Sequence, residues 1–151
     1  MTARHASRAM LAAALAVAGV PADAAEPSLR GVAQAHLAAV EARDLDALLA
    51  TVTSHDKLTL LFPDGSAFTT RAQYVDFHKE WFADRAWHFH GEIVDVIETP
   101  QLGHVLARYR YESGGKAAAK DTWLALTFAK ERGRWRLVFD QNTRIEPQPA
   151  K

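Results

Sequence analysis

The second half of the chain consists of four long segments separated by short turn sequences, and this pattern restricts the fold more than any other feature. The segments are rich in aromatic and β-branched residues, as β-strands are, and they cover residues 87–98, 103–113, 119–130 and 134–145. The turn sequences TPQLG, SGGKA and ERGR carry the proline and glycine residues that end strands and close hairpins. We therefore expect four consecutive antiparallel strands.

Helices and one short hairpin are predicted ahead of these strands. Residues 28–44 begin with a serine, which caps helices well, and their apolar side chains recur at spacings of three and four. Asp44 can cap a second short helix, and residues 57–62 (KLTLLF) form a strand that the turn PDG joins to a short partner. A third helix begins after one of two threonines, Thr69 or Thr70. Helices on one face of an antiparallel sheet make an α+β fold.

The N-terminal segment differs in composition from the rest and has the form of a secretory signal peptide over residues 1–24. Two arginines precede an apolar run, residues 9–20, which is shorter than the ~20 residues of a membrane-spanning helix. The sequence ADA at residues 22–24 has the small-x-small pattern of a cleavage site. We expect a periplasmic or secreted protein that does not associate with the membrane after cleavage. One domain would then cover residues 28–146, followed by a flexible tail at 147–151.

Composition excludes several classes of function. Without the signal peptide the chain carries 16 basic and 17 acidic residues, so it lacks the surplus of positive charge that binding to nucleic acid requires. It has no cysteine, which excludes disulfides and thiol chemistry. No phosphate-binding loop, nucleophile elbow or dinucleotide fingerprint is present in the sequence, and we expect no cofactor.

The third predicted helix carries a histidine within its apolar stripe. The stripe has the spacing of one helical face and consists of Tyr74, Phe77, His78, Trp81 and Phe82. His78 should therefore be buried against the sheet, where an imidazole needs a hydrogen-bond partner. We predict that this partner is a polar group of the last strand, Asp140 first and Asn142 second, directly or through one water.

The order of the elements resembles a known superfamily, and three stretches carry the resemblance: FHKEWF (77–82), WHFHGEIVDV (87–96) and GRWRLVFDQNTRI (133–145). They resemble the nuclear-transport-factor-2-like superfamily, in particular its SnoaL-like branch and the association domain of calcium/calmodulin-dependent protein kinase II. The resemblance covers residues 28–146. It implies a cone in which a curved antiparallel sheet wraps round a long helix, with two or three N-terminal and central helices on one face. It also implies a pocket in the wide end and a homodimer formed through the outer face of the sheet.

Alternation along residues 134–145 divides the side chains between two faces, with Trp135 and Leu137 on one and Asp140 and Asn142 on the other. Hydrophobicity does not identify the inner face, because the outer face of a dimerising sheet is also apolar. The resemblance implies that Asp140 and Asn142 face the pocket.

The resemblance also implies other pocket residues. The stretch DFHKEW is similar to the helix that presents a pocket histidine in the kinase association domain, which corresponds to His78. Arg110, or Arg108 two residues earlier, lies near a pocket arginine of that domain. Two further pocket arginines correspond here to Leu126 and Asn142, so recognition of an anionic ligand by an arginine cluster is not implied. The predicted ligand site consists of Tyr74, His78, Trp81, Arg110, Asp140 and Asn142, with His78 and Asp140 as the candidate catalytic residues.

His88 and His90 form an H-x-H pattern on one strand, and Glu92 lies on the same face. This spacing could supply two or three ligands to zinc or another transition metal, and His104 would join them if its strand pairs with this one. A solvated strand face is the commoner use of such residues, so we expect no metal.

Three functions are consistent with these patterns, and the fold alone does not choose among them. We predict first an exported domain whose conical pocket binds a small, largely apolar molecule. The alternative is a cofactor-free isomerase, dehydratase or cyclase, with Asp140 or His78 as the base and Tyr74 or Asn142 as the oxyanion partner. The third is an oligomeric assembly module, for which the cone would be filled with side chains.

Overall fold

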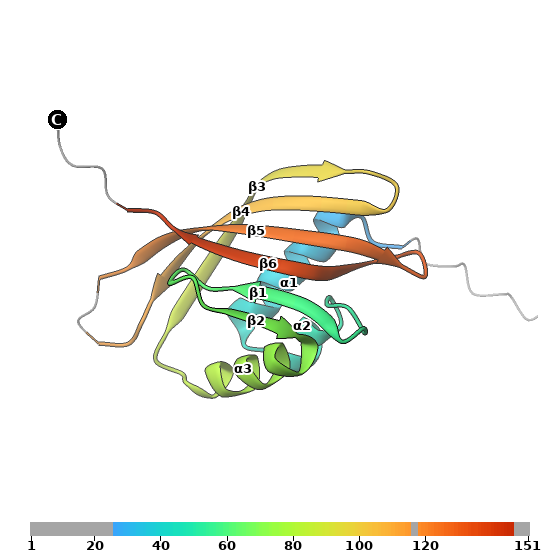
Figure 1. Cartoon of the computed structure of the whole chain (residues 1–151). Coiled ribbons are helices and arrows are strands. Elements are labelled where there is room, and N and C mark those ends of the chain that lie inside the picture. Colours follow the sequence, from blue (N-terminus) through green and yellow to red (C-terminus); the bar gives the residue numbers. More distant parts are fainter. Residues whose placement is uncertain (1–25, 116–117, 147–151) are drawn as a thin grey trace, which may run out of the picture.

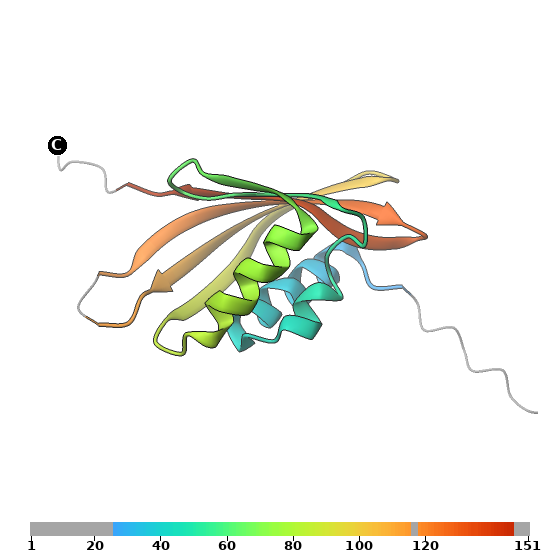
Figure 2. The same ribbon diagram turned by 60° about the horizontal axis from the view of Figure 1, so that its bottom comes forward.

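The computed structural model of the chain describes residues 26–115 and 118–146, so the predicted signal peptide and tail lie outside the described residues. Within those residues, three helices lie against one face of a six-stranded sheet (Figures 1 and 2). This arrangement is the predicted α+β fold. None of the described helices combines the length and the apolar character that a membrane-spanning helix needs.

Each helix begins at a side-chain cap. The helices are α1 (Leu29–Ala42), α2 (Leu45–Leu49) and α3 (Arg71–Ala83). The Oγ of Ser28 accepts a hydrogen bond from the backbone N of Gly31 at 3.1 Å, which satisfies a free donor in the first turn of α1. Asp44 caps α2 in the same way, and Thr70 rather than Thr69 caps α3. Both caps predicted at single residues are confirmed.

The strands form one sheet in the order β2-β1-β6-β5-β4-β3. Their bounds are β1 (Lys57–Leu61), β2 (Ala67–Thr70), β3 (His88–Glu98), β4 (Leu102–Glu112), β5 (Lys120–Glu131) and β6 (Arg134–Arg144). Strands β3 to β6 pair antiparallel with their neighbours along the chain, which confirms the four predicted consecutive strands. Strand β1, however, pairs parallel to β6. The turn sequences could not reveal this pairing, because they report only on strands that follow each other directly.

The sheet curves over the helices without closing, and Figure 2 shows the three helices beneath its concave face. Helix α1 packs against β3, β4 and β6, whereas α3 packs against β1 and β2. The buried apolar side chains between these layers form one core, whose fully covered members include Leu29, Leu58, Trp87, Val105, Leu126, Phe128 and Leu137. The helices and the concave face therefore enclose the interior of the cone.

A β-bulge in β6 changes which side chains face this interior. Phe139 lies opposite Thr127 of β5, but Leu137 lies opposite the next residue, Phe128, so Val138 is an extra residue in β6. The alternation of faces is interrupted there. Strict alternation along the strand predicted Trp135 and Leu137 on the opposite face from Asp140 and Asn142, and this prediction is wrong. All four side chains lie on the concave side, as the resemblance implied for Asp140 and Asn142.

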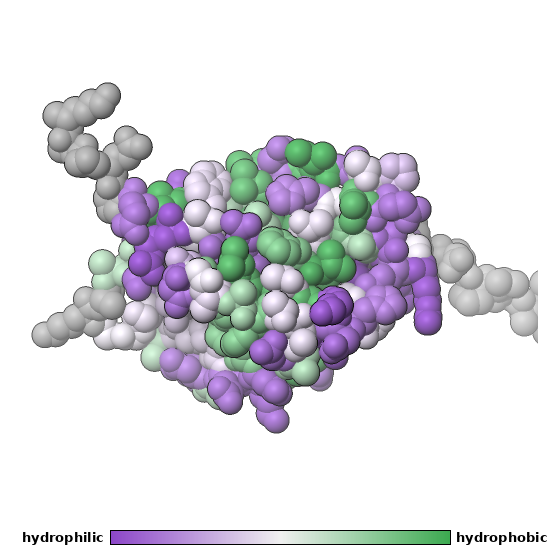
Figure 3. Space-filling model, viewed as in Figure 1, coloured by the Kyte–Doolittle hydropathy of each residue, from purple (hydrophilic) through white to green (hydrophobic). Residues whose placement is uncertain are grey.

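The outer face of the sheet carries exposed apolar side chains. The large ones are Val94, Ile97, Leu102 and Trp123, with exposed fractions of 52%, 60%, 53% and 36%. Figure 3 shows apolar residues in green among polar ones over this face. In the described part of the chain, all three helices cover the opposite face, so these side chains are left in contact with water.

Candidate functional site

A cavity of about 350 Å³ lies between the concave face of the sheet and helices α1 and α3. This volume is within the roughly 300–1,000 Å³ typical of small-molecule sites. Its wall is mainly apolar and aromatic, and includes Val40, Leu60, Phe62, Phe77, Trp81, Phe89 and Leu124. The exposed residues Lys120 and Arg144 also line it, so the cavity reaches solvent near the start of β5 and the end of β6.

Asp140 is the buried acidic group of this cavity, with 6% of its surface exposed. Its Oδ1 accepts a hydrogen bond from Nδ2 of Asn142 at 2.9 Å, and the same Nδ2 donates to the carbonyl oxygen of Leu61 at 3.1 Å. The hydroxyl of Tyr109 donates to Oδ1 of Asn142 at 2.9 Å. The amide of Asn142 is therefore held in one orientation and uses both of its hydrogens.

Burial raises the pKa of Asp140 above its ordinary value. The loss of hydration penalises the charged carboxylate and raises its pKa from 3.8 to about 7, although the hydrogen bond from Asn142 acts in the opposite direction. A carboxyl group with this pKa exists in both protonation states near neutral pH. It can therefore accept a proton and also donate one, as acid–base catalysis requires.

His78 lies in the cavity wall and is buried, as predicted. Its Nδ1 is 2.8 Å from the carbonyl oxygen of Tyr74, one turn earlier in α3. No direct hydrogen bond joins His78 to Asp140 or Asn142 in the described residues, so the direct form of the prediction is wrong, and the form bridged by one water stays a prediction. Burial lowers the pKa of His78 to about 4, although the bond to Tyr74 opposes this shift, so the ring is neutral at physiological pH.

A second buried histidine, His36 of α1, also lines the cavity. Its Nδ1 is 2.8 Å from Oγ1 of Thr51, and this hydroxyl donates its own hydrogen to the carbonyl of Leu48 at 2.7 Å. Burial, and secondly the charge of nearby His78, lower the pKa of His36 to about 3. His36 is not among the site residues predicted from the sequence. Its position in the apolar stripe of the first helix was a usable signal, of the same kind as that for His78.

Tyr74 and Trp81, two other predicted ligand residues, have different positions. Trp81 is part of the cavity wall, whereas the fully buried Tyr74 packs behind it, its ring 4.1 Å from that of His78 between centroids. Within the described residues the Tyr74 hydroxyl has no hydrogen-bond partner. Burial, and secondly the charge of Asp140, raise the pKa of Tyr74 well above its ordinary value, so the hydroxyl keeps its hydrogen.

Arg110 does not line this cavity, contrary to what the resemblance implied. Its neighbours Tyr109 and Tyr111 face the cavity, so alternation along β4 directs Arg110 to the outer face. There its Nε lies 3.2 Å from Oε1 of Glu112. Arg108 lies on the same outer face, paired with Asp121 at 3.2 Å. Neither arginine considered for the site therefore reaches the interior of the cone.

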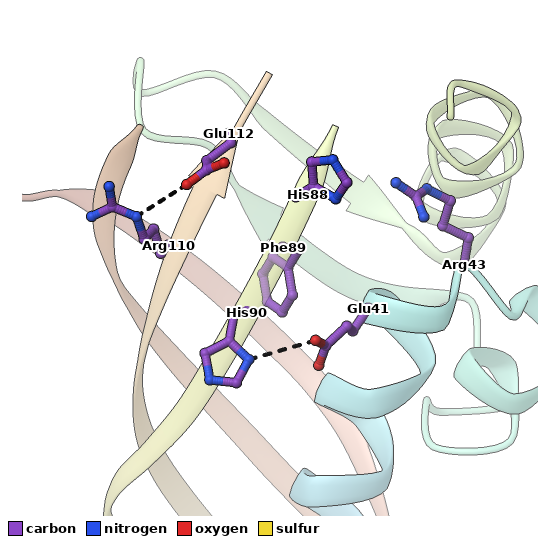
Figure 4. Close-up of a pocket in the computed structure, with 7 residues that line it drawn as sticks. All are labelled: Glu41, Arg43, His88, Phe89, His90, Arg110 and Glu112. Carbon is purple, nitrogen blue, oxygen red and sulfur yellow. Dashed lines mark hydrogen bonds and ion pairs between the residues drawn. The ribbon is translucent and has the colours of Figure 1, made fainter. Parts of the chain in front are cut away.

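Arg110 belongs instead to a separate, polar hollow of about 250 Å³ at the β3 edge of the sheet (Figure 4). His88 and His90 also line this hollow, and Nδ1 of His90 lies 3.5 Å from Oε1 of Glu41. Nε2 of His90 is 3.6 Å from Oε1 of Glu92. Across residues 26–115 and 118–146, no group of three or more His, Asp or Glu side chains is arranged to hold a metal ion. The H-x-H pattern thus acquires no further ligands.

Comparison with solved structures supports the fold at low sequence identity. A structure from Thiobacillus denitrificans described as a calcium/calmodulin-dependent protein kinase type II association domain is 18% identical, with a TM-score of 0.70, covering 82% of this chain and 100% of its own. A ketosteroid isomerase-like protein from Erwinia carotovora atroseptica is 19% identical, with a TM-score of 0.67. Its match covers 79% of this chain and 95% of its own. An LEH-like epoxide hydrolase from Mycobacterium tuberculosis is 14% identical, with a TM-score of 0.58 and coverages of 76% and 80%.

Two further matching structures, from Shewanella oneidensis and Caulobacter vibrioides, are described as nuclear-transport-factor-2-like and as having a cystatin-like fold, and the chain shares this fold. A comparison with curated proteins finds no match. The family model of the SnoaL-like domain, however, matches residues 29–141, which is most of the described chain. The chain therefore belongs to the family of SnoaL-like domains.

Proposed function

We propose that this domain is exported and binds a small, largely apolar molecule inside the cone. The observation that carries the proposal is the cavity of about 350 Å³ with aromatic and aliphatic walls. Because the cavity is open to solvent, its apolar walls lack the contacts of a packed interior and face water, which is unfavourable. A ligand that fills the space recovers those contacts. The same observation disfavours a pure assembly module, which has no need of a hollow interior.

Naphthalene is a suitable first probe, because it is apolar, rigid and fluorescent. We expect saturable binding to the wild type and a loss of at least tenfold in affinity for Val40→Phe, which adds bulk to the cavity wall. Ala38→Phe is the matched control, since Ala38 is an exposed residue of the same helix. Melting temperatures verify that both variants fold. Equal affinities in all three proteins would show that naphthalene does not enter this cavity.

The homodimer is proposed on the basis of the outer face. Ile97 and Leu102 are exposed apolar side chains on adjacent strands of this face and Trp123 is exposed further along it, and a second copy of the chain would remove all three from water. The resemblance to the superfamily implies the same surface. Dimerisation on this face leaves the cavity, on the other side of the sheet, free to bind its ligand.

A second function, cofactor-free acid–base catalysis, is favoured by one specific observation: Asp140, whose pKa lies near 7, is in the wall of an apolar cavity. Asn142 cannot serve as the oxyanion partner, because both hydrogens of its amide are already used. Tyr74 has a free hydroxyl but lies behind the wall. The chemistry would therefore consist of proton removal by the Asp140 carboxylate and proton return from the same group.

The second function can be tested by hydrogen–deuterium exchange. NMR would follow exchange at the α-carbon of 2-tetralone in D₂O. The carboxylate would take the α-proton, exchange it with solvent and return a deuteron to the same carbon. We expect the exchange rate to rise with pD through the titration of Asp140 and to fall to the buffer rate in Asp140→Asn. Equal rates for the two proteins would exclude Asp140 as the base.

A further inference from the structure

The two buried histidines of the cavity are held in the same tautomer. The carbonyl of Tyr74 can only accept, so Nδ1 of His78 must donate to it. The Thr51 hydroxyl has already given its hydrogen to the carbonyl of Leu48, so Nδ1 of His36 must donate to Thr51. A neutral imidazole carries one hydrogen. Both Nε2 atoms are consequently bare acceptors.

Neither Nε2 atom has a partner in the part of the chain that the structure describes, although both residues line the cavity. No donor of the described residues is hydrogen-bonded to either Nε2 atom, and the free hydroxyl of Tyr74 makes no such bond. The Tyr109 hydroxyl and the Asn142 amide are engaged with each other and with Asp140. A ligand without a hydrogen-bond donor would thus leave two buried acceptors unsatisfied, which is unfavourable.

We propose that the ligand carries a hydroxyl group, on an aromatic or alicyclic body, that donates its one hydrogen to the Nε2 atom of either His78 or His36. This inference rests on the proposed function and specifies its ligand class. A hydroxyl fits better than an ammonium group for two reasons. Burying a charge costs far more than burying a hydroxyl, and the cations Lys120 and Arg144 at the solvent side of the cavity repel a positive ligand.

Three probes of the same shape separate donor, acceptor and apolar contributions: 2-naphthol, 2-methoxynaphthalene and naphthalene. Only naphthol has a hydrogen to donate, whereas the methyl ether keeps the oxygen as an acceptor. The protein used is the chain without its predicted signal peptide. At pH 7 we expect naphthol to bind it about tenfold more tightly than either of the other probes does, because about one net hydrogen bond is gained. Titrations by fluorescence, with calorimetry as an independent check, measure all three affinities.

Variants locate the acceptors. His78→Phe and His36→Phe keep an aromatic ring in the core but remove Nε2, so the variant that lacks the accepting nitrogen should lower the ratio of the naphthol and naphthalene affinities by about threefold or more. His90→Phe is the control, because His90 is an exposed histidine of the outer hollow, and its ratio should equal that of the wild type. Using the ratio cancels any general change in the cavity. If one histidine variant fails to fold, equal affinities of the three probes for the wild type would still overturn the inference.

The outcomes are distinct. Equal affinities of the three probes for the wild type would overturn this inference while leaving the apolar-ligand proposal in place. Tighter binding of the methyl ether than of naphthol would also overturn it, because it would show that the cavity donates hydrogen bonds. Binding of none of the three probes would refute both proposals. A naphthol preference that persists undiminished in both histidine variants would assign the acceptor to another group and contradict the inference.

Discussion

Replacement of Asp140 by asparagine should stabilise the protein, and the gain should grow with pH. Asp140 is buried, and its pKa is raised from 3.8 to about 7 by the loss of hydration. The folded state therefore holds a proton that the unfolded state has released. The raised pKa stabilises the folded state in full below pH 3.8, and this stabilisation is lost as pH rises through 7. Asparagine is neutral throughout and keeps an oxygen that can accept the hydrogen bond from Asn142.

The size of the effect follows from the two pKa values. Each unit of difference corresponds to about 1.4 kcal/mol, so at pH 8 the ionised carboxylate costs about 4 kcal/mol relative to a neutral group. At pH 5 most of that cost is absent, because the folded protein is still protonated. We expect the free energy of unfolding of Asp140→Asn, relative to the wild type, to increase by about 2 to 3 kcal/mol between pH 5 and pH 8. For a domain of this size, that is a shift in relative melting temperature of roughly 10 °C.

The quantity to measure is the difference in the free energy of unfolding between the two proteins. Circular dichroism can follow their thermal and urea unfolding at four pH values from 5 to 8. Working with the difference removes the contributions of His36 and His78, which both proteins retain. Asp121→Asn is the matched control, since Asp121 is a half-exposed aspartate that pairs with Arg108 on the outer face, and its difference should not change over this range. A constant difference for Asp140→Asn, or one that is larger at pH 5 than at pH 8, would refute the reasoning.

Three further predictions follow from other parts of the chain. Burial lowers the pKa of His78 to about 4, so the folded state loses stability as pH falls below 6.5. Between pH 7 and pH 5 the free energy of unfolding of the wild type, measured with urea, should therefore fall by about 2 kcal/mol more than that of His78→Phe. Equal losses in the two proteins would contradict this. N-terminal sequencing of exported material should begin at Ala25 or close by, whereas an intact Met1 on soluble cytoplasmic protein would oppose export. Sedimentation should show a homodimer that Leu102→Lys converts to monomer, and a wild-type monomer at micromolar concentration would exclude the proposed interface.

The elements of the fold were predictable because local chemistry determines them. Ser28 and Asp44 identify helix starts through hydrogen bonds that reach only three residues along the chain. The burial of His78 was predictable for a similar reason, since a residue in an apolar helical stripe faces the core wherever the helix packs. The partner of His78 was not predictable in this way, because a carbonyl of its own helix competed with groups on a distant strand.

The site was predicted only in part because its residues come together from two helices and five strands. Asp140 and Asn142 were assigned to the pocket through a resemblance, while the alternation argument for the same strand failed at Val138. A bulge depends on how two neighbouring strands are aligned, and the sequence of one strand does not report it. His36 was missed because a histidine in a helical stripe gives the same pattern whether it faces packed side chains or an empty cavity.

By itself, the sequence determined the class of the fold, the order of its helices and strands, and the absence of thiol chemistry. These properties depend on residue type and on spacings of a few residues, which any reader of the chain can count. Only the tertiary structure decided that burial raises the pKa of Asp140 to about 7, that His36 and His78 line one cavity, and that Arg110 lies outside it. Desolvation, hydrogen-bond direction and the side of a sheet all depend on groups far apart in the chain, whose positions exist only once it has folded.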